Sequence, residues 1–133
     1  MYSFIDHTAD IAFEIYAKDL KELLRDAALA FYEAFVFTEK IGERIQKEIV
    51  IEESSVDYLL YNWLNEILYL FDVEHFGGKR VDVEVTNGKA KGKIYGDFLN
   101  PLKIKLEPKA ITLHNFRVEK RNGGYYAYVV VDI

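Results

Sequence analysis

Residues 55–73 (SVDYLLYNWLNEILYLFDV) constrain the fold more than any other segment of this chain. Apolar side chains recur there at steps of three and four residues, which places them in one wide stripe on an α-helix. These side chains are Val56, Leu59, Leu60, Trp63, Leu64, Ile67, Leu68 and Phe71. Tyrosines and Leu70 interrupt the polar residues of the opposite side. We therefore expect a core helix whose two sides both meet other protein, so that little of it contacts water.

A second helix is predicted over residues 18–35. Asp19, followed three positions later by Glu22, is typical of a capping box at a helix start. One face of the segment carries apolar side chains at helical spacing: Leu20, Leu23, Leu24, Ala27, Ala28, Phe31, Ala34 and Phe35. A helix with one apolar face is expected to lie on a sheet.

Alternation of apolar and polar residues predicts strands over 1–5, 11–17, 44–53, 80–86, 89–98, 109–121 and 125–133. Asn87-Gly88 is the clearest hairpin signal, because both residues of a two-residue turn need positive φ. A second hairpin is expected at Asn122-Gly123-Gly124, and Gly77-Gly78 is expected in the loop that follows the central helix.

These elements predict a single α+β domain over residues 1–133, with two main helices packed on a mixed or antiparallel β-sheet. The strand-helix-strand layout of residues 11–53 resembles the layout around the central helix and the hairpin after it. This similarity hints at two related modules in one compact domain.

Composition and charge exclude several classes of protein. The chain has no cysteine, which rules out disulfides, thiolate zinc sites and cysteine nucleophiles. Seventeen Lys and Arg against 22 Asp and Glu give a formal net charge of −5, the wrong sign for binding nucleic acid mainly through phosphates. The opening MYSFIDHTAD lacks the regions of a secretory signal, and no apolar run is long enough to span a membrane. We expect a cytoplasmic protein with no membrane partner.

Acidic residues at the two ends of the chain are the first candidates for a functional site. Asp6 and Asp10 lie between the first two predicted strands, and Asp132 and the α-carboxylate of Ile133 end the last one. If the last strand pairs with the strand beginning at Ile11, Asp10 and Asp132 reach the same end of the sheet. Oxygen ligands of this kind suit hard cations such as Ca²⁺ or Mg²⁺. The simpler interpretation is that these aspartates are solvated or hydrogen-bond the local backbone in a polar turn.

Three further positions are weaker candidates. Lys109 starts a predicted strand, where a lysine is usually just exposed to solvent. His114 and Thr112 share one side of a regular strand, but a structural histidine is the simpler interpretation. Asn62 and Glu66, one helical turn apart, are expected to form a polar contact inside the fold.

Several site types have no support in the sequence. There is no EF-hand loop, no Gly-rich phosphate loop before a helix and no serine in a nucleophile elbow. The three histidines, His7, His75 and His114, lack the spacing of a zinc site. Nucleotide hydrolysis and acyl transfer are therefore not indicated.

Five short blocks, in order along nearly the whole chain, resemble the archease family. They are DHTADIAFEI (6–15), LLYNWLNEILYLFD (59–72), YGD (95–97), KAITLH (109–114) and the closing VDI (131–133). Archeases are small protein cofactors of the GTP-dependent RNA ligase that joins tRNA halves after intron removal. The resemblance implies their fold, in which one strand-helix-strand-strand module is inserted in another.

The resemblance also implies a site. The metal-binding positions of the family fall on Asp10, Asp132 and Ile133, which would hold a divalent cation, most of all calcium, with magnesium or manganese as alternatives. The functional lysine of the family falls on Lys109, so Asp10, Lys109 and Asp132 are the residues expected to activate the ligase. Possible supporting residues are His7, Asp6, Asp97 and His114.

The chain departs from the family pattern at three positions away from these metal ligands. Asp97 stands where glutamate is frequent, Leu113 where an aromatic residue is common, and Lys18 where glycine is often found. These differences concern the finer shape of the surface.

The implied function is that of a non-catalytic activator. Archeases promote guanylylation of the ligase, sustain its multiple turnover and broaden its use of nucleoside triphosphates, and they meet tRNA only indirectly. Two alternatives remain open from the residues themselves. One is a stand-alone metal-dependent hydrolase that uses the same carboxylates, and the other is a chaperone-like binding module that works through tyrosine-rich surfaces.

Overall fold

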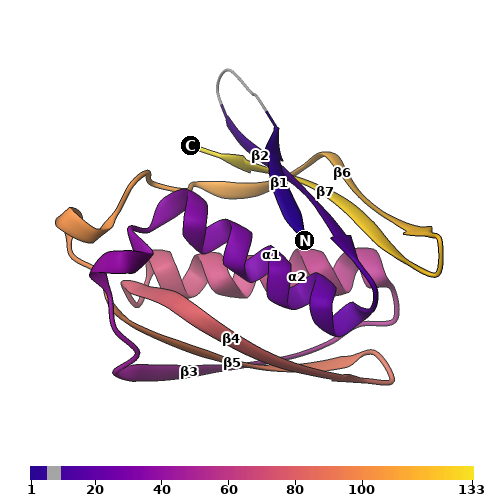
Figure 1. The fold of residues 1–133 in the computed structure, drawn as a ribbon, viewed down its shortest axis with the longest axis horizontal. Coiled ribbons are helices and arrows are strands. Elements are labelled where there is room, and N and C mark those ends of the chain that lie inside the picture. Colours follow the sequence, from indigo (N-terminus) through magenta and orange to yellow (C-terminus); the bar gives the residue numbers. More distant parts are fainter. Residues whose placement is uncertain (6–9) are drawn as a thin grey trace.

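The computed structural model of the protein describes residues 1–5 and 10–133 (Figure 1). Within them the elements follow in the order β1 (Tyr2–Ile5), β2 (Asp10–Ala17), α1 (Leu20–Phe35), β3 (Ile45–Glu52), α2 (Val56–Asp72), β4 (Phe76–Thr86), β5 (Lys89–Phe98), β6 (Ala110–Arg121) and β7 (Gly124–Asp132). Short 3-10 helices cover Thr38–Lys40 and Pro101–Lys103.

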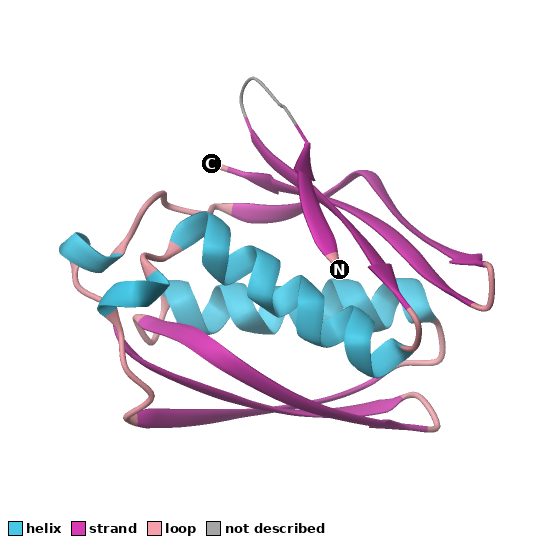
Figure 2. Ribbon diagram, in the orientation of Figure 1, coloured by secondary structure: helices cyan, strands magenta, loops and turns pink. Residues whose placement is uncertain are grey.

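Two antiparallel sheets enclose the two helices. One sheet has the strand order β1-β2-β7-β6 and the other has the order β3-β5-β4. Figures 1 and 2 show the four-stranded sheet above and the three-stranded sheet below a middle layer of helices. α1 packs on β2 and β4, whereas α2 packs on β6 and β3. The predicted α+β class is confirmed, and the sheets are antiparallel.

One module is nested inside another. β3, α2, β4 and β5 form a strand-helix-strand-strand unit that has its own sheet and lies in the sequence between α1 and β6. The outer unit consists of β2, α1, β6 and β7, to which β1 adds an edge strand. The nested arrangement implied by the family resemblance is thus confirmed.

α1 begins where the capping box was expected. The Asp19 side chain accepts a hydrogen bond from the Glu22 N–H at 2.8 Å, which satisfies one of the free amides at the helix start. The Glu22 carboxylate in turn accepts a hydrogen bond from the Lys18 N–H at 2.7 Å. In the usual capping box the donor is the N–H of the N-cap residue itself, which here would be Asp19. Most of the apolar face of α1 is buried between the sheets, and Leu24 and Phe31 are fully buried.

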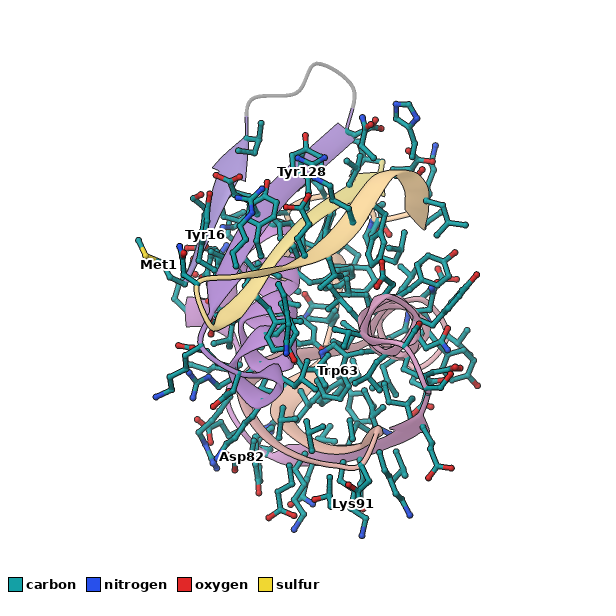
Figure 3. The ribbon with its side chains drawn as sticks, turned by 90° about the vertical axis from the view of Figure 1, so that its right-hand side faces the viewer. Met1, Tyr16, Trp63, Asp82, Lys91 and Tyr128 are labelled. Atoms are coloured by element: carbon teal, nitrogen blue, oxygen red, sulfur yellow. The ribbon has the colours of Figure 1, made fainter. Side chains whose placement is uncertain are left out.

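α2 binds the two modules together through Trp63, which points from the helix into the interior in Figure 3. The Trp63 Nε1–H donates to the Leu24 carbonyl of α1 at 2.8 Å, so the buried indole is hydrogen-bonded across the helix layer. Gly92 of β5 leaves the room that the ring needs, because a Cβ at that position would clash with the indole.

The expectation that little of α2 contacts water is wrong. The face with Leu60, Trp63 and Ile67 is fully buried, but Tyr58 and Tyr69 remain 59% and 50% exposed. Each sheet covers α2 from one side, and no described element covers the outward half of the helix. The predicted contact between Asn62 and Glu66 is also absent, because Asn62 Nδ2 donates to Glu53 at 2.6 Å while Glu66 faces solvent.

The predicted start of the strand after α2 needs correction. β4 begins at Phe76, so Gly77-Gly78 belongs to the strand and not to a loop. Its glycines are required by packing, since a Cβ on Gly78 would clash with the Tyr32 ring of α1. The hairpin at Asn87-Gly88 is confirmed, with φ of 50° and 77°. No helix among residues 1–5 and 10–133 is long and apolar enough to cross a membrane.

Candidate functional site

The pairing of β2 with β7 brings together residues that lie far apart in the sequence. In this antiparallel pair Asp10 lies directly opposite Asp132. Directly opposed residues of antiparallel strands have Cα atoms about 4.5–5.5 Å apart and side chains on the same face of the sheet. The prediction that Asp10 and Asp132 reach the same end of one sheet is confirmed.

β6 adds the predicted lysine to this end of the sheet. The backbone N–H of Lys109 donates to the Asp132 carbonyl at 2.7 Å, and the next residue, Ala110, lies opposite Asp132. The Lys109 side chain is exposed. Lys109, directly before β6, therefore lies beside Asp132 of β7, which in turn lies opposite Asp10 of β2.

The two aspartates lie on the sheet face that points away from the helices. Their neighbours Ile11 and Val131 pack on the core, and Val131 is fully buried. Side chains alternate between the two faces of a strand, so Asp10 and Asp132 point outward. Asp10 is half-buried and Asp132 is exposed, so a ligand can approach both carboxylates from solvent.

An open hollow of about 520 Å³ borders Asp10. Phe4, Ile11 and Ala34 form much of its wall. Lys105 lies at the hollow too, and its Nζ donates to the Glu33 carbonyl at the end of α1, 2.9 Å away. No sequence pattern pointed to this hollow, because its walls come from β1, β2, α1 and the loop before β6, which are far apart in the chain.

The chemistry of these groups fits a hard divalent cation. Asp10 and Asp132 supply two carboxylates, and Ile133 follows directly with an exposed fraction of 38%. Two like charges directly opposed on one sheet face repel each other, and a cation between them would offset that repulsion. Among the described residues no three His, Cys, Asp or Glu side chains form a metal-binding group. Asp6 and His7, predicted as supporting residues, lie outside the described residues.

Asp97 is held elsewhere, in the three-stranded sheet. Its carboxylate accepts hydrogen bonds from Arg44 Nε and Nη2, each at 3.1 Å, and from the Phe98 N–H at 2.9 Å. The Arg44 hydrogen bonds hold the pKa of the Asp97 carboxyl below its usual value. The residue is only 4% exposed. The structure therefore does not bring Asp97 to Asp10 and Asp132, and a supporting role for it stays a prediction.

His114 lies in an irregular stretch of β6 and not in the regular strand that was expected to place it on one side with Thr112. Thr112 lies opposite Val130 and Arg117 opposite Tyr128, so residues 113–116 bulge out opposite a single residue of β7. Asn115 has a φ of 60°, a conformation that asparagine tolerates better than most residues. The His114 N–H donates to Thr112 Oγ1 at 3.0 Å, and the side chain is exposed.

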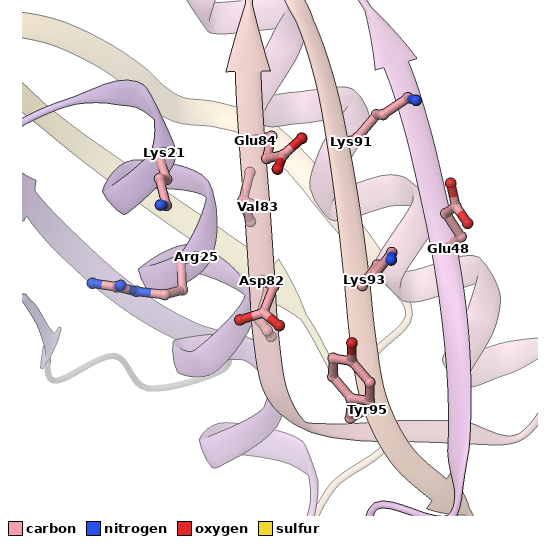
Figure 4. Close-up of a pocket in the computed structure, with 10 residues that line it drawn as sticks. Lys21, Arg25, Glu48, Asp82, Val83, Glu84, Lys91, Lys93 and Tyr95 are labelled. Atoms are coloured by element: carbon pink, nitrogen blue, oxygen red, sulfur yellow. The ribbon is translucent and has the colours of Figure 1, made fainter.

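Another hollow lies apart from these residues, on the outer face of the three-stranded sheet and beside α1 (Figure 4). It has a volume of about 630 Å³, and its charges compensate each other across the strands. Lys93 lies between Glu48 of β3 and Asp82 of β4, and Lys91 lies opposite Glu84. Opposite charges on neighbouring strands are a common way to stabilise a solvated sheet face.

Comparison with known proteins agrees with the family resemblance. The chain matches the model of the Archease protein family (MTH1598/TM1083) over residues 2–133. It is 56% identical to "Protein archease" of Archaeoglobus fulgidus over 135 residues, covering 99% of this chain and 98% of the relative. It is 36% identical to "Protein archease" of Sulfolobus acidocaldarius, again covering 99% and 98%.

Solved structures show the same fold. Protein 1598 of Methanobacterium thermoautotrophicum aligns with a TM-score of 0.79 at 27% identity, covering 99% of this chain and 98% of its own. An archease of Thermotoga maritima aligns with a TM-score of 0.69 at 23% identity, covering 100% and 98%. The matched sequence, the nested modules and these folds agree along the whole length, and the chain therefore belongs to the archease family.

Proposed function

We propose that this protein is a non-catalytic activator of the GTP-dependent tRNA-splicing RNA ligase, and that it acts through a divalent cation bound at Asp10, Asp132 and Ile133. The observation that carries the proposal is the direct opposition of Asp10 and Asp132 between β2 and β7. In this role it promotes guanylylation of the ligase and multiple turnover, and it broadens the range of nucleoside triphosphates that the ligase uses.

Calcium is the cation proposed first, with magnesium or manganese as alternatives. Calcium accepts six to eight oxygen ligands in flexible geometry, so two carboxylates, an oxygen of Ile133 and water suit it. Asp10 and Asp132 hold the cation at the solvent-facing end of the sheet. Lys109 places a positive charge directly before the neighbouring strand β6, where it can pair with an anionic group of the partner.

Charge supports a protein partner that itself binds RNA. A ligase that binds RNA phosphates has to be positively charged around its active site. This chain carries the opposite charge, a formal net charge of −5. Opposite charges favour association and set its orientation. The same net charge disfavours direct binding of tRNA, so we propose that tRNA is reached only through the ligase.

A ligation assay with limiting ligase, GTP and tRNA halves tests the proposal. The wild-type protein is expected to raise product above one turnover per ligase. Asp10→Ala and Asp132→Ala are expected to abolish that stimulation, and Lys109→Ala to weaken it. Glu84→Ala, which removes an exposed carboxylate from the other sheet, is the matched control and should stimulate fully. Full stimulation by both aspartate variants would refute the proposal.

The same preparations separate the two alternatives. Hydrolysis of RNA or a phosphate ester by the purified protein with Mg²⁺ alone would favour a stand-alone hydrolase. The Thermotoga maritima structure is described as that of a "possible chaperone". If this protein bound many unrelated proteins, and the aspartate substitutions did not affect that binding, a chaperone-like binding module would be favoured.

A further inference from the structure

The outward half of α2 combines aromatic and acidic side chains. Tyr58 and Tyr69 are at least half exposed, and Asp57, Glu66 and Asp72 face solvent beside them. Tyrosine is enriched in protein interfaces, because its ring provides apolar contact and its hydroxyl can hydrogen-bond. Exposed tyrosines spaced along one helix face are thus more typical of a binding surface than of a solvated one.

This half of α2 is acidic without internal compensation. The 17 residues of the helix include no Lys, Arg or His. In the part of the chain that the structure describes, Asp57, Glu66 and Asp72 form no ion pair, whereas every arginine does. Glu53 adds another carboxylate, held against the helix by Asn62. Such a surface is complementary to a cationic partner and repels phosphates.

An apolar hollow of about 350 Å³ opens at the N-terminal end of the same surface. Tyr58 and Tyr61 of α2 line one side, and Leu113 and Phe116 from the β6 bulge line the other. The rings of Tyr61 and Phe116 meet edge to face with centroids 5.7 Å apart. Leu113 is 63% exposed, because it belongs to the bulge and not to the regular part of the strand. Asp57 lines the same hollow.

We propose that the outward half of α2 and this hollow, together the α2 surface (Asp57, Tyr58, Tyr61, Glu66 and Leu113), bind a basic protein segment that inserts one apolar side chain. The apolar side chain fills the hollow, and neighbouring Lys or Arg side chains pair with Asp57 and Glu66. This rests on the proposed function, so the segment belongs to the RNA ligase.

The α2 surface and the candidate metal site are close enough to contact one partner. Lys109 directly precedes β6 and Leu113 lies four residues further along, which corresponds to at most about 13 Å in an extended chain. The two sites differ in their tasks. The α2 surface provides affinity, whereas Asp10 and Asp132 act after binding.

Two pairs of substitutions test this division. The first, Asp57→Asn with Glu66→Gln, removes two carboxylates from the α2 surface without adding bulk. The matched control, Glu48→Gln with Glu84→Gln, removes two exposed carboxylates from the outer face of the three-stranded sheet. A third variant, Leu113→Ser, removes the exposed apolar wall of the hollow. Circular dichroism establishes that each variant is folded.

Binding of each variant to the purified ligase is measured by isothermal titration calorimetry, and stimulation by the ligation assay. We expect the Asp57/Glu66 pair and Leu113→Ser each to raise the Kd for the ligase by about tenfold or more. The control pair should keep the wild-type Kd. Stimulation should return to the wild-type level once the variant saturates the ligase. The Kd of the wild-type protein should rise as the salt concentration rises. The Kd of the Asp57/Glu66 pair should rise less steeply with salt.

The outcomes separate this inference from the proposed function. If every α2-surface variant bound the ligase with wild-type affinity, the inference would be overturned and the proposed function would be unaffected. Absence of both binding and stimulation by the wild-type protein would overturn both. Dimerisation of the protein alone, lost in the Asp57/Glu66 pair, would show that a second copy covers the surface, and would also overturn the inference.

Discussion

The indole of Trp63 lies against the backbone of Gly92, where a Cβ on the glycine would clash with the ring. Gly92→Ala is expected to lower the free energy of unfolding by about 1–3 kcal/mol, because the buried indole has to leave its rotamer or push β5 away. Urea denaturation measures the change. Gly42→Ala is the control, since a Cβ there meets nothing closer than Asp97 Oδ2 at 3.8 Å. Equal stability of the two variants would contradict this account of the packing.

Tyr32 is a site where a substitution should stabilise the fold. Its hydroxyl is buried and has no hydrogen-bond partner among the described residues. A buried hydroxyl without a partner costs about 1–3 kcal/mol of desolvation. Tyr32→Phe is therefore expected to raise the free energy of unfolding by about 1 kcal/mol, as measured by urea denaturation. A loss of stability in Tyr32→Phe would contradict an unpaired hydroxyl at this position.

Acid stability depends in part on Asp97. Hydrogen bonds from Arg44 lower the pKa of this carboxyl in the folded protein below the usual value of 3.8. The unfolded chain therefore binds the proton first, and the stabilisation is present above the ordinary pKa and lost as pH falls through the folded pKa. Asp97→Asn is expected to be less stable at neutral pH, with the difference from wild type shrinking on acidification. If the free energies of unfolding of wild type and Asp97→Asn changed in parallel over this pH range, a contribution of Asp97 to acid stability would be excluded.

Metal binding should be visible without the ligase. If Asp10 and Asp132 hold Ca²⁺, the ion stabilises the folded state by about 2.7 kcal/mol at a free concentration a hundred times its Kd. We expect calcium to raise the Tm of the wild-type protein and EDTA to reverse the shift. Asp132→Asn should abolish the response. If calcium, magnesium and manganese all left the Tm of the wild-type protein unchanged, divalent cation binding at Asp10 and Asp132 would be contradicted.

The secondary structure was predictable where local chemistry decides it. The apolar spacing around Trp63 defined α2, Asp19 and Glu22 marked the start of α1, and Asn87-Gly88 defined a hairpin. The start of β4 was missed because Gly77-Gly78 reads locally as a loop. Only the fold shows that Tyr32 and Leu99 occupy the space of the missing side chains.

The candidate site was predictable in outline and not in detail. Asp10 and Asp132 were placed together because paired strands share their ends, and the register agrees. The ion pair of Asp97 with Arg44 was missed, since 53 residues separate the partners and neither belongs to a local motif. The exposed half of α2 was missed for a related reason. Its tyrosines indicate burial against protein, but the sequence does not say whether that protein is the same chain.

The nesting of one module inside the other governs when the site can assemble. Asp10 and Asp132 belong to the outer unit, and the inserted unit lies between them in the sequence. Strand pairs of such wide sequence separation form slowly, because closing a long loop precedes any stabilising contact. On the ribosome, β3 to β5 can reach their native contacts while β7 is still unsynthesised. A nascent chain thus lacks the paired aspartates until residue 132 has emerged, and any function that needs both carboxylates has to wait for that point.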